Sequence, residues 1–240
     1  MSGLSIFDRL FGTGAHTLSV DGLFLHGTAR IAKQEVAVIG TRDHAAIDGS
    51  LALRIAEAIL HTVRDDAAQG TPPRPIIFIA DTQGQALSRH EELLGLNGYF
   101  AHIVRCVDLA RRQGHRSLTI ISGEAVSGGF LAYGMMADRI CALPESQVRV
   151  MDLRAMSRVT KISLEHLEAL AKQSPVFAPG AENYWRMGGI HEIWTESDDW
   201  LQRMASALIH ATNSDERATI GLEREGRLLA APTAQLVAGS

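Results

Sequence analysis

Two glycine-bearing segments hold the residues whose types and spacing could do chemistry. One contains Gly84 and Gln85, the other Ser127, Gly128 and Gly129, and each begins where an apolar run ends. Backbone N–H groups at such a turn, or at the start of the helix that follows, can bind a negatively charged oxygen. Each donor contributes roughly 3–4 kcal/mol when charge develops on a carbonyl oxygen in a transition state. A packing role is the alternative here, because glycines also let two backbones approach closely.

The elements that must position these segments follow from the hydrophobic pattern. β-branched apolar runs predict buried strands and a four-residue period predicts helices. The predicted strands are 36–40, 76–80, 117–121, 140–143 and 148–151, and the predicted helices are 50–64, 88–113 and 130–137. Strands that alternate with helices indicate βαβ units and a layered α/β fold.

Local signals add detail to these elements. Asp81–Gln85 is expected to form a tight turn, and Ser88 with Glu91 gives a capping box that opens the helix 88–113. Gly95 and Gly98 inside that helix are expected to serve close packing.

The chain divides by pattern into an N-terminal arm (1–16), a core (17–155) and a helical C-terminal region (156–240) of the same domain. Helices are expected near 163–172, 198–212 and 214–229, and the last ten residues look loose. The second of these helices presents apolar residues that suggest a partner surface: Leu201, Met204, Leu208 and Ile209.

Composition excludes several classes of protein. The net charge is −4 and basic residues are not interleaved with aromatic ones, so no nucleic-acid partner is expected. The ten histidines form no motif with metal-ligand spacing, and no phosphate-binding glycine loop is present. No apolar run approaches the ~20 residues of a membrane span, and no signal peptide is recognisable. We therefore expect a cytoplasmic protein with no metal and no membrane contact, whose Cys106 and Cys141 are core residues.

Residues 119–140, which read TIISGEAVSGGFLAYGMMADRI, resemble the signature of the crotonase superfamily. That resemblance implies a crotonase-like ββα superhelix with a helical C-terminal tail. It implies an oxyanion donor at Gly128, with Gly129 beside it, and a second donor at Gly84 or Gln85. The acidic residue that crotonase-type hydratases carry after the glycines is replaced by Phe130 and Leu131, which argues against hydration of an enoyl thioester.

The segment also resembles the Clp-type serine peptidases, with Ser127 at the position of their nucleophile. Their base histidine would fall near Met151, where this chain has none. Without that proton acceptor, a serine nucleophile lacks its activation.

A longer stretch of the sequence resembles one group within this superfamily. Asp81-Thr82-Gln83-Gly84, Glu91-Glu92 and the Gly123–Gly129 segment are similar to motifs of the acyl-CoA carboxyltransferases, except that Gln83 replaces a proline. Among these, the chain most resembles the gamma subunits of malonate decarboxylases. That resemblance implies a homologous beta subunit, an acyl carrier protein and an acyl transferase as partners. It implies no directly bound cofactor, because the thioester prosthetic group is carried by the acyl carrier protein.

The implied reaction is decarboxylation of a malonyl thioester, which needs an enolate oxygen to be stabilised but needs no nucleophile or metal. The resemblance makes Gly84, Gln85, Gly128 and Gly129 catalytic. Ser127 and Glu124 are candidate substrate-binding residues, and Tyr133 and His102 are proton-source candidates by side-chain type only. Two alternatives stay open: an alpha-type subunit of a biotin-dependent acyl-CoA carboxyltransferase, and a non-catalytic structural half of the complex.

Overall fold

The computed structural model describes residues 3–173, 179–212 and 214–239. The strands are β1 (His16–Asp21), β2 (Phe24–Ile31), β3 (Gln34–Thr41), β4 (Ala45–Ile47), β5 (Ile76–Gln85), β6 (Ser117–Val126), β7 (Arg139–Ala142), β8 (Gln147–Arg149) and β9 (Glu192–Ile193). The helices are α1 (Gly3–Phe11), α2 (Gly49–Gln69), α3 (Arg89–Leu93), α4 (Leu96–Arg112), α5 (Ser127–Tyr133), α6 (Leu153–Thr160), α7 (Leu164–Gln173), α8 (Ala181–Arg186), α9 (Trp200–Ile209), α10 (Arg217–Glu223) and α11 (Ala230–Ala238). The sequence prediction of a layered α/β fold is confirmed.

One twisted sheet organises the molecule, with the strand order β1-β2-β3-β5-β6-β7-β9. The first three strands form an antiparallel meander, and β3, β5, β6, β7 and β9 run parallel to one another. Two short strands lie off this path, where β4 pairs with the end of β5 and β8 pairs with the end of β6. Both additions therefore lie at the carboxyl end of the central strands, where ligands bind in open α/β sheets.

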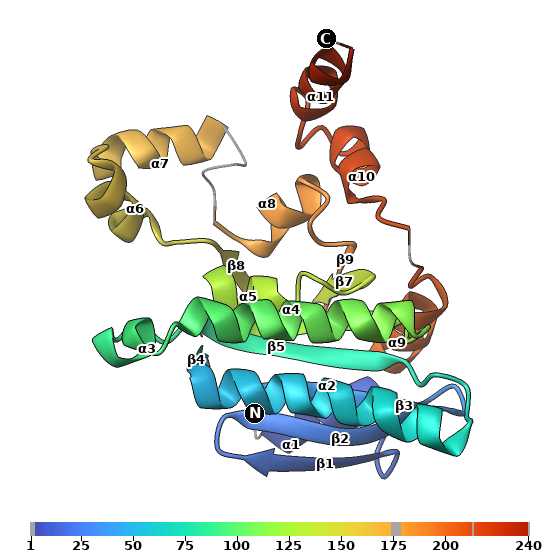
Figure 1. The fold of residues 1–240 in the computed structure, drawn as a ribbon. Helices are drawn as coiled ribbons and strands as arrows, with labels where there is room; N and C mark the ends of the chain where they lie inside the picture. The colour runs from blue at the N-terminus through green and yellow to red at the C-terminus, as the bar shows by residue number, and fades with distance from the viewer. Residues whose placement is uncertain (1–2, 174–178, 213, 240) are drawn as a thin grey trace.

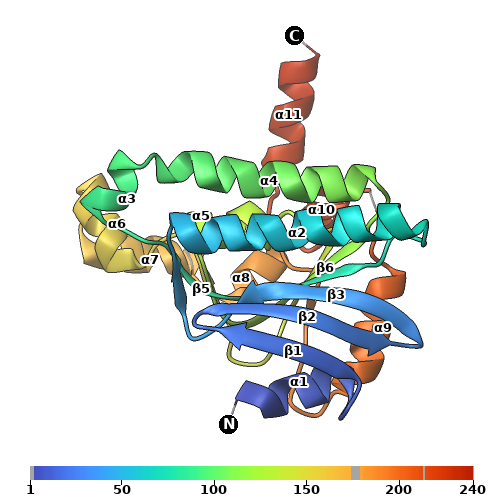
Figure 2. The same cartoon turned by 60° about the horizontal axis from the view of Figure 1, so that its bottom comes forward.

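Helices cover both faces of the sheet (Figures 1 and 2). Helices α2, α4 and α5 pack on one face, while α1 and α9 pack on the other. The central strand β5 shows the consequence in its sequence, since Ile76 and Phe78 enter the first core while Ile77 and Ile79 enter the second. A strand buried on both faces reads as a continuous apolar run.

The helix predicted at 88–113 is interrupted. Ser88 caps α3 by accepting the Glu91 N–H, but the Glu91 carboxylate accepts the N–H of Gly49 at the start of α2 and leaves the capping box incomplete. Gly95 has a φ of 73°, which ends α3 and precedes α4. The packing role predicted for Gly95 and Gly98 is wrong, because a Cβ at Gly98 would have no atom within 4 Å and one at Gly95 would have only Asn97 Oδ1, at 3.9 Å.

The C-terminal helices differ from their predicted form. Met204 and Leu208 of α9 are buried against α1 and the sheet, so the prediction that they form a partner surface is wrong. Ile209 on the same helix is 70% exposed. The helix predicted at 214–229 is confined to α10, and most of the last ten residues form α11 rather than a loose end. Figure 1 shows α11 extending away from the body. Met1, Ser2 and Ser240 lie outside the described residues, and the division into arm, core and helical region stays a prediction.

Candidate functional site

The segment Asp81–Gln85 is an extension of β5, so the tight turn predicted there is wrong. Its register against β6 shifts between Ala80 and Thr82, and β4 supplies a second ladder partner beyond that point. The strand predicted at 117–121 likewise runs on to Val126, and its last three residues pair with β8. Both corrections have one cause: partners distant in the sequence keep these segments extended.

Thr82 fixes the end of β5 from inside the protein. Its Oγ1 donates to the carbonyl of Ala45 (2.6 Å) and accepts the N–H of Gly84 (3.0 Å). Gly84 itself has a φ of 102°, a conformation that glycine adopts without strain. The N–H of Gly84, predicted as a possible oxyanion donor, therefore already has a hydrogen-bond partner within this chain.

The second glycine segment meets the first directly. A Cβ on Gly129 would lie 2.8 Å from the carbonyl carbon of Gly84 and 3.0 Å from Thr82 Oγ1. A Cβ on Gly128 would lie 3.2 Å from Oε1 of Gln85. The structure thus brings together the four residues predicted as catalytic, in what we call the glycine junction: Gly84, Gln85, Gly128 and Gly129.

Ser127 opens α5 at the glycine junction in a conformation that is rare for a residue with a side chain. Its φ is 51°, and a non-glycine residue in such a region costs on the order of 1–3 kcal/mol. No side chain caps the start of α5. The N–H groups of a first helical turn have no partner within their helix, which leaves them available to a ligand.

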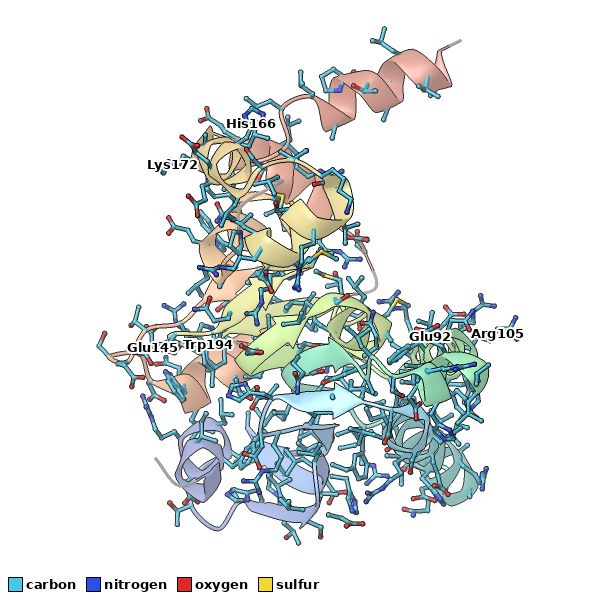
Figure 3. All side chains as sticks on the ribbon, turned by 90° about the vertical axis from the view of Figure 1, so that its left-hand side faces the viewer. Glu92, Arg105, Glu145, His166, Lys172 and Trp194 are labelled. Atoms are coloured by element: carbon cyan, nitrogen blue, oxygen red, sulfur yellow. The ribbon has the colours of Figure 1, made fainter. Side chains whose placement is uncertain are left out.

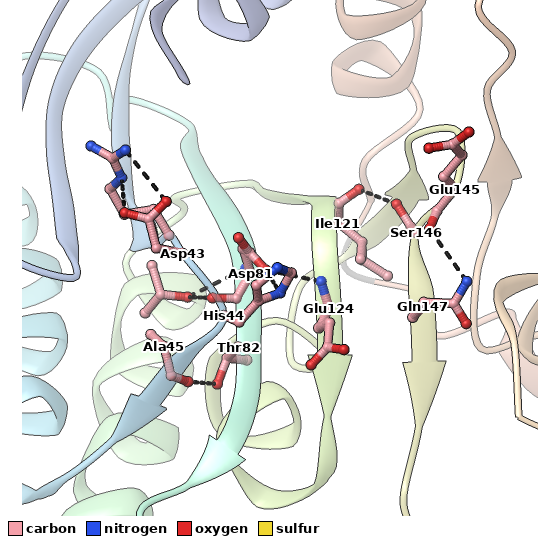
Figure 4. Close-up of polar contacts among 12 residues, drawn as sticks. Asp43, His44, Ala45, Asp81, Thr82, Ile121, Glu124, Glu145, Ser146 and Gln147 are labelled. Atoms are coloured by element: carbon pink, nitrogen blue, oxygen red, sulfur yellow. Dashed lines mark hydrogen bonds and ion pairs between the residues drawn. The ribbon is translucent and has the colours of Figure 1, made fainter. Parts of the chain in front are cut away.

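Glu124 lies on β6 rather than at a turn, and its charge has a partner within the chain. Its carboxylate pairs with Arg149 on β8 (3.0 Å), and its N–H donates to Asp81 Oδ1 (2.9 Å). The same Asp81 oxygen lies 3.1 Å from Nδ1 of His44, as Figure 4 shows. A Cβ on Gly123 would come within 2.4 Å of that oxygen, so the glycine admits the carboxylate.

Sequence reasoning missed this Asp81 cluster. Asp81, His44 and Glu124 belong to β5, the β3–β4 connection and β6, and only the sheet brings them together. The available signal was Gly123, a residue without a Cβ directly before Glu124 in the strand.

The two proton-source candidates lie in different surroundings. Tyr133 is fully buried, its hydroxyl lies 2.8 Å from Thr41 Oγ1, and it donates to the carbonyl of Ile79 (3.3 Å). Burial raises the pKa of the Tyr133 phenol above its ordinary value, so the hydroxyl stays protonated. His102 is exposed on α4 and lies 3.8 Å from the sulfur of Cys106. Both cysteines are buried, as predicted.

Two cavities lie close to the central sheet but apart from the glycine junction. One of about 390 Å³ opens beside Asp81, Ser122 and Gly123 on the α1 side of the sheet. The other, of about 480 Å³, lies between α2 and strands β2 and β3. Neither cavity is lined by a residue of the glycine junction.

The described residues contain no group of three or more histidine, cysteine or acidic side chains placed to hold a metal ion. No helix among them is long and apolar enough to cross a bilayer.

Comparison with known proteins places this arrangement in a family. A model described as the malonate decarboxylase gamma subunit matches residues 43–240. The malonyl-S-ACP:biotin-protein carboxyltransferase of Malonomonas rubra is 31% identical over 229 residues, covering 85% of this chain and 78% of that protein.

Two solved structures extend the comparison. A chain of a Pseudomonas malonate decarboxylase hetero-tetramer in complex with coenzyme A superposes with a TM-score of 0.82 at 25% identity, covering 99% of this chain and 98% of that one. Transcarboxylase 12S shares the fold alone, with a TM-score of 0.67 at 15% identity over 86% of this chain and 40% of that one. The crotonase-like fold predicted from the sequence is confirmed. Because the family model spans most of the sequence, the chain belongs to the malonate decarboxylase gamma subunit family.

Proposed function

We propose that this chain acts with a homologous beta subunit to convert a malonyl thioester, carried by an acyl carrier protein, into the acetyl thioester and CO2. The observation that carries the proposal is the backbone contact between Gly84 and Gly129 at the glycine junction. This contact joins the extended end of β5 to the uncapped start of α5. Glycine is present on each side, where a side chain would keep the strand and the helix apart. Backbone donors held this rigidly need no reorganisation when charge develops.

The reaction requires few other groups from this chain. The bond between the carboxylate carbon and the α-carbon breaks, its electron pair enters the thioester enolate, CO2 leaves, and the α-carbon then takes a proton. The start of α5 at Gly128 and Gly129 supplies N–H donors for the enolate oxygen. On β5 the donor is the N–H of Gln85, because the N–H of Gly84 is bonded to Thr82. We assign no cofactor to this chain, since the thioester arm belongs to the carrier protein.

The surface around the glycine junction supports a shared site. Large apolar side chains are exposed on the segments that adjoin it, and we call the following four the junction face: Leu87, Leu93, Leu131 and Val150. They are 46–83% exposed. We take them as one contact surface, because contiguous exposed apolar patches mark interaction sites. Figure 3 looks onto this end of the molecule, where Glu92 of α3 lies at one side and His166 and Lys172 of α7 lie above. The proposed occupant is the beta subunit, because the similar Pseudomonas protein was solved as a hetero-tetramer.

The test is reconstitution. CO2 release from a malonyl thioester should be absent with this chain alone and present when the beta and carrier subunits are added. Equal activity without the partner would contradict the shared site. A bulky residue at Gly128 should abolish release while the pair still assembles. If release persists in an assembled Gly128→Val pair, the chain is a structural half and the partner does the chemistry.

The identity to a biotin-protein carboxyltransferase favours a second candidate, in which the carboxyl group is transferred to a biotinylated protein rather than released. Adding avidin to the reconstituted complex separates the two. CO2 release that avidin does not inhibit supports the first function, and avidin-sensitive carboxylation of an added biotinylated acceptor protein supports the second.

A further inference from the structure

Thr82 is a fully buried polar residue that the proposed reaction does not use directly. It lies on β5 two residues before Gly84, and its exposed fraction is 0%. A substrate therefore cannot contact its hydroxyl, and any influence of that hydroxyl on the site must act through neighbouring atoms. Buried polar groups are hydrogen-bonded, so the partners of the Thr82 hydroxyl show where such an influence goes.

The hydroxyl of Thr82 contacts the peptide groups on both sides of Gly84. Its oxygen accepts the N–H of Gly84 (3.0 Å), and it donates to the carbonyl of Ala45 on β4 (2.6 Å, Figure 4). The same oxygen lies 3.3 Å from the carbonyl oxygen of Gly84. One side chain thus ties both peptide groups of Gly84 to β4.

These contacts act where strand β5 is irregular. Its pairing with β6 shifts register between Ala80 and Thr82. Its pairing with β4 shifts register between Ala45 and Ala46. Gly84 follows with a φ of 102°, and a glycine populates other conformations about as readily. The hydroxyl of Thr82 therefore restricts a residue that neither its own Cβ nor a regular ladder would hold in one conformation.

The peptide group between Gly84 and Gln85 carries the donor proposed on β5. This peptide is trans, so the N–H of Gln85 points opposite to the carbonyl of Gly84. Because that carbonyl lies on the Thr82 side, the Gln85 N–H points away from the buried hydroxyl. The start of α5 lies against the same peptide, since a Cβ on Gly129 would lie 2.8 Å from the carbonyl carbon of Gly84 and 3.0 Å from Thr82 Oγ1. The Thr82 hydroxyl therefore sets the direction of the Gln85 N–H relative to the first turn of α5.

We propose that Thr82 is a positioning residue, whose hydroxyl fixes the Gly84–Gln85 peptide so that the Gln85 N–H and the N–H groups at the start of α5 converge on one oxyanion. The inference deepens the proposed function and rests on it. No bond to Thr82 forms or breaks in the reaction. Its effect belongs to the transition state, because the negative charge that the donors must face develops only there.

The experiment measures kcat and KM for CO2 release by the complete reconstituted complex, carrying the wild-type chain, Thr82→Val, Thr82→Ser or Thr119→Val. Valine is similar to threonine in shape but lacks the hydroxyl, whereas serine keeps it. Thr119 on β6 is the matched control, because it is also fully buried and donates to a backbone carbonyl, that of Gly134 (2.8 Å) at the other end of α5.

The expected effect follows from the loss of alignment. Misplacing a catalytic group by about 1 Å costs about 10²-fold, so we expect kcat to fall roughly 100-fold in Thr82→Val, with KM changed less than about threefold. Because serine keeps the hydroxyl, kcat of Thr82→Ser should return close to the wild-type value. In Thr119→Val, kcat should stay near wild type even though a buried hydrogen bond is lost.

Selective 15N labelling of glycine adds a readout that does not depend on activity. The amide resonance of Gly84 should shift in Thr82→Val, where this N–H loses its acceptor, and should return toward the wild-type position in Thr82→Ser. An unshifted Gly84 resonance in Thr82→Val would contradict the contact on which the inference depends.

Two kinetic results would overturn the positioning role: an unchanged kcat in a folded Thr82→Val complex, or an equal fall of kcat in Thr119→Val. Circular dichroism and hetero-dimer assembly show whether each variant folds. If Thr82→Val does not fold, Thr82→Ala takes its place, because it leaves room for a water molecule at the Gly84 N–H, and it should lower kcat likewise. Release by the wild-type complex with unchanged kcat in the variant contradicts the inference alone, whereas no release by the wild-type complex contradicts the proposed function and the inference together.

Discussion

At the scale of single residues, the glycine junction depends on the lack of a side chain at two positions. Gly129 contacts the backbone of Gly84, and Gly128 contacts the carboxamide of Gln85. Gly128 and Gly129 do not have a left-handed φ, so glycine is needed there because a Cβ would collide with neighbouring atoms. At Gly84 glycine is needed because the backbone has a positive φ.

Substitution of Gly129 by alanine should be costly. The added Cβ would meet the Gly84 backbone at 2.8 Å, and forcing an extra methyl into a packed core typically costs 1–3 kcal/mol. Gly98→Ala is the matched control, because its Cβ has no neighbour within 4 Å and alanine is the better helix former by about 1 kcal/mol. Urea unfolding should show the free energy of unfolding falling in the first variant and rising slightly in the second. A fall of equal size in both would contradict this account.

Tyr133 gives a second prediction at this scale. Tyr133→Phe removes the hydroxyl bonded to Thr41 and to the Ile79 carbonyl, which should lower the free energy of unfolding by about 1–2 kcal/mol. Because the hydroxyl lies in the core, we expect kcat for CO2 release to be unchanged. A large fall in kcat in a folded variant would instead assign the proton source to Tyr133.

The residue types of the site were predictable from the sequence, but their contacts were not. Small residues after two apolar runs are visible in any sequence, so Gly84 and Gly128 could be identified together. The Asp81–His44 pair and the bond from the Glu124 N–H to Asp81 join segments that only the sheet brings together. A local pattern contains no information on such pairings.

At the scale of elements, strand ends were the hardest to predict, for the same reason. The pattern located the first halves of β5 and β6, where every residue is buried. It missed their second halves, which stay extended because β4 and β8 pair with them. The division of the predicted helix 88–113 at Gly95 was signalled only by the glycine, whose φ of 73° ends α3.

The junction of β7 with β9 predicts a pH dependence of stability. His191 Nδ1 accepts the N–H of Ile140, so the ring must stay neutral. Burial, together with Arg139, Arg217 and Arg224 and opposed by Asp215, lowers the pKa of His191 from 6.5 to about 4. Between these two values the unfolded chain binds the proton and the folded chain does not, so stability falls as the pH drops from 6.5 toward 4.

Stability should be measured as the free energy of unfolding in urea at a series of pH values from 7.5 to 4.5. In His191→Asn, whose side-chain oxygen can accept the Ile140 N–H without titrating, the dependence should be shallower by on the order of 1–3 kcal/mol over this range. Identical pH profiles for the two proteins would show that His191 does not contribute.

At the scale of the whole molecule, the N-terminal helix and helix α9 of the C-terminal region meet on one face of the sheet. Helix α1 packs against α9, with Phe7 and Leu10 in the same core as Met204 and Leu208 (Figure 2). Arg9 adds a cation–π contact, its guanidinium carbon lying 3.5 Å from the Trp200 ring centroid. The N-terminal helix therefore holds part of the C-terminal region on the sheet.

Leu10→Ala tests this arrangement. Leu10 is fully buried, and truncating such a leucine typically costs 2–5 kcal/mol. Ile209→Ala removes a similar amount of apolar side chain from α9 at a position that is 70% exposed, and its effect should stay within about 0.5 kcal/mol. Thermal unfolding should separate the two clearly, and equal melting temperatures would mean that α1 is not part of the folded core.

Assembly tests the junction face. Leu87→Glu combined with Leu131→Glu places two charges on it, and should weaken the hetero-dimer with the beta subunit at least 10-fold. Ile209→Glu adds a charge to an exposed apolar position on α9, outside the junction face, and should leave the affinity unchanged. Analytical ultracentrifugation of the mixed subunits measures both, and equal affinities would place the interface elsewhere.

Helix α11 has a consequence for the lifetime of the protein in the cell. From Leu228 to Ser240 the sequence contains no charged residue. Leu228 and Leu229, just before α11, and Leu236 on α11 are 59–80% exposed, and the helix extends away from the body. Chaperones and proteases continuously triage chains that expose apolar segments. We therefore expect a pulse-chase experiment to show rapid turnover of the chain made alone and slow turnover of a variant whose three leucines are changed to glutamine.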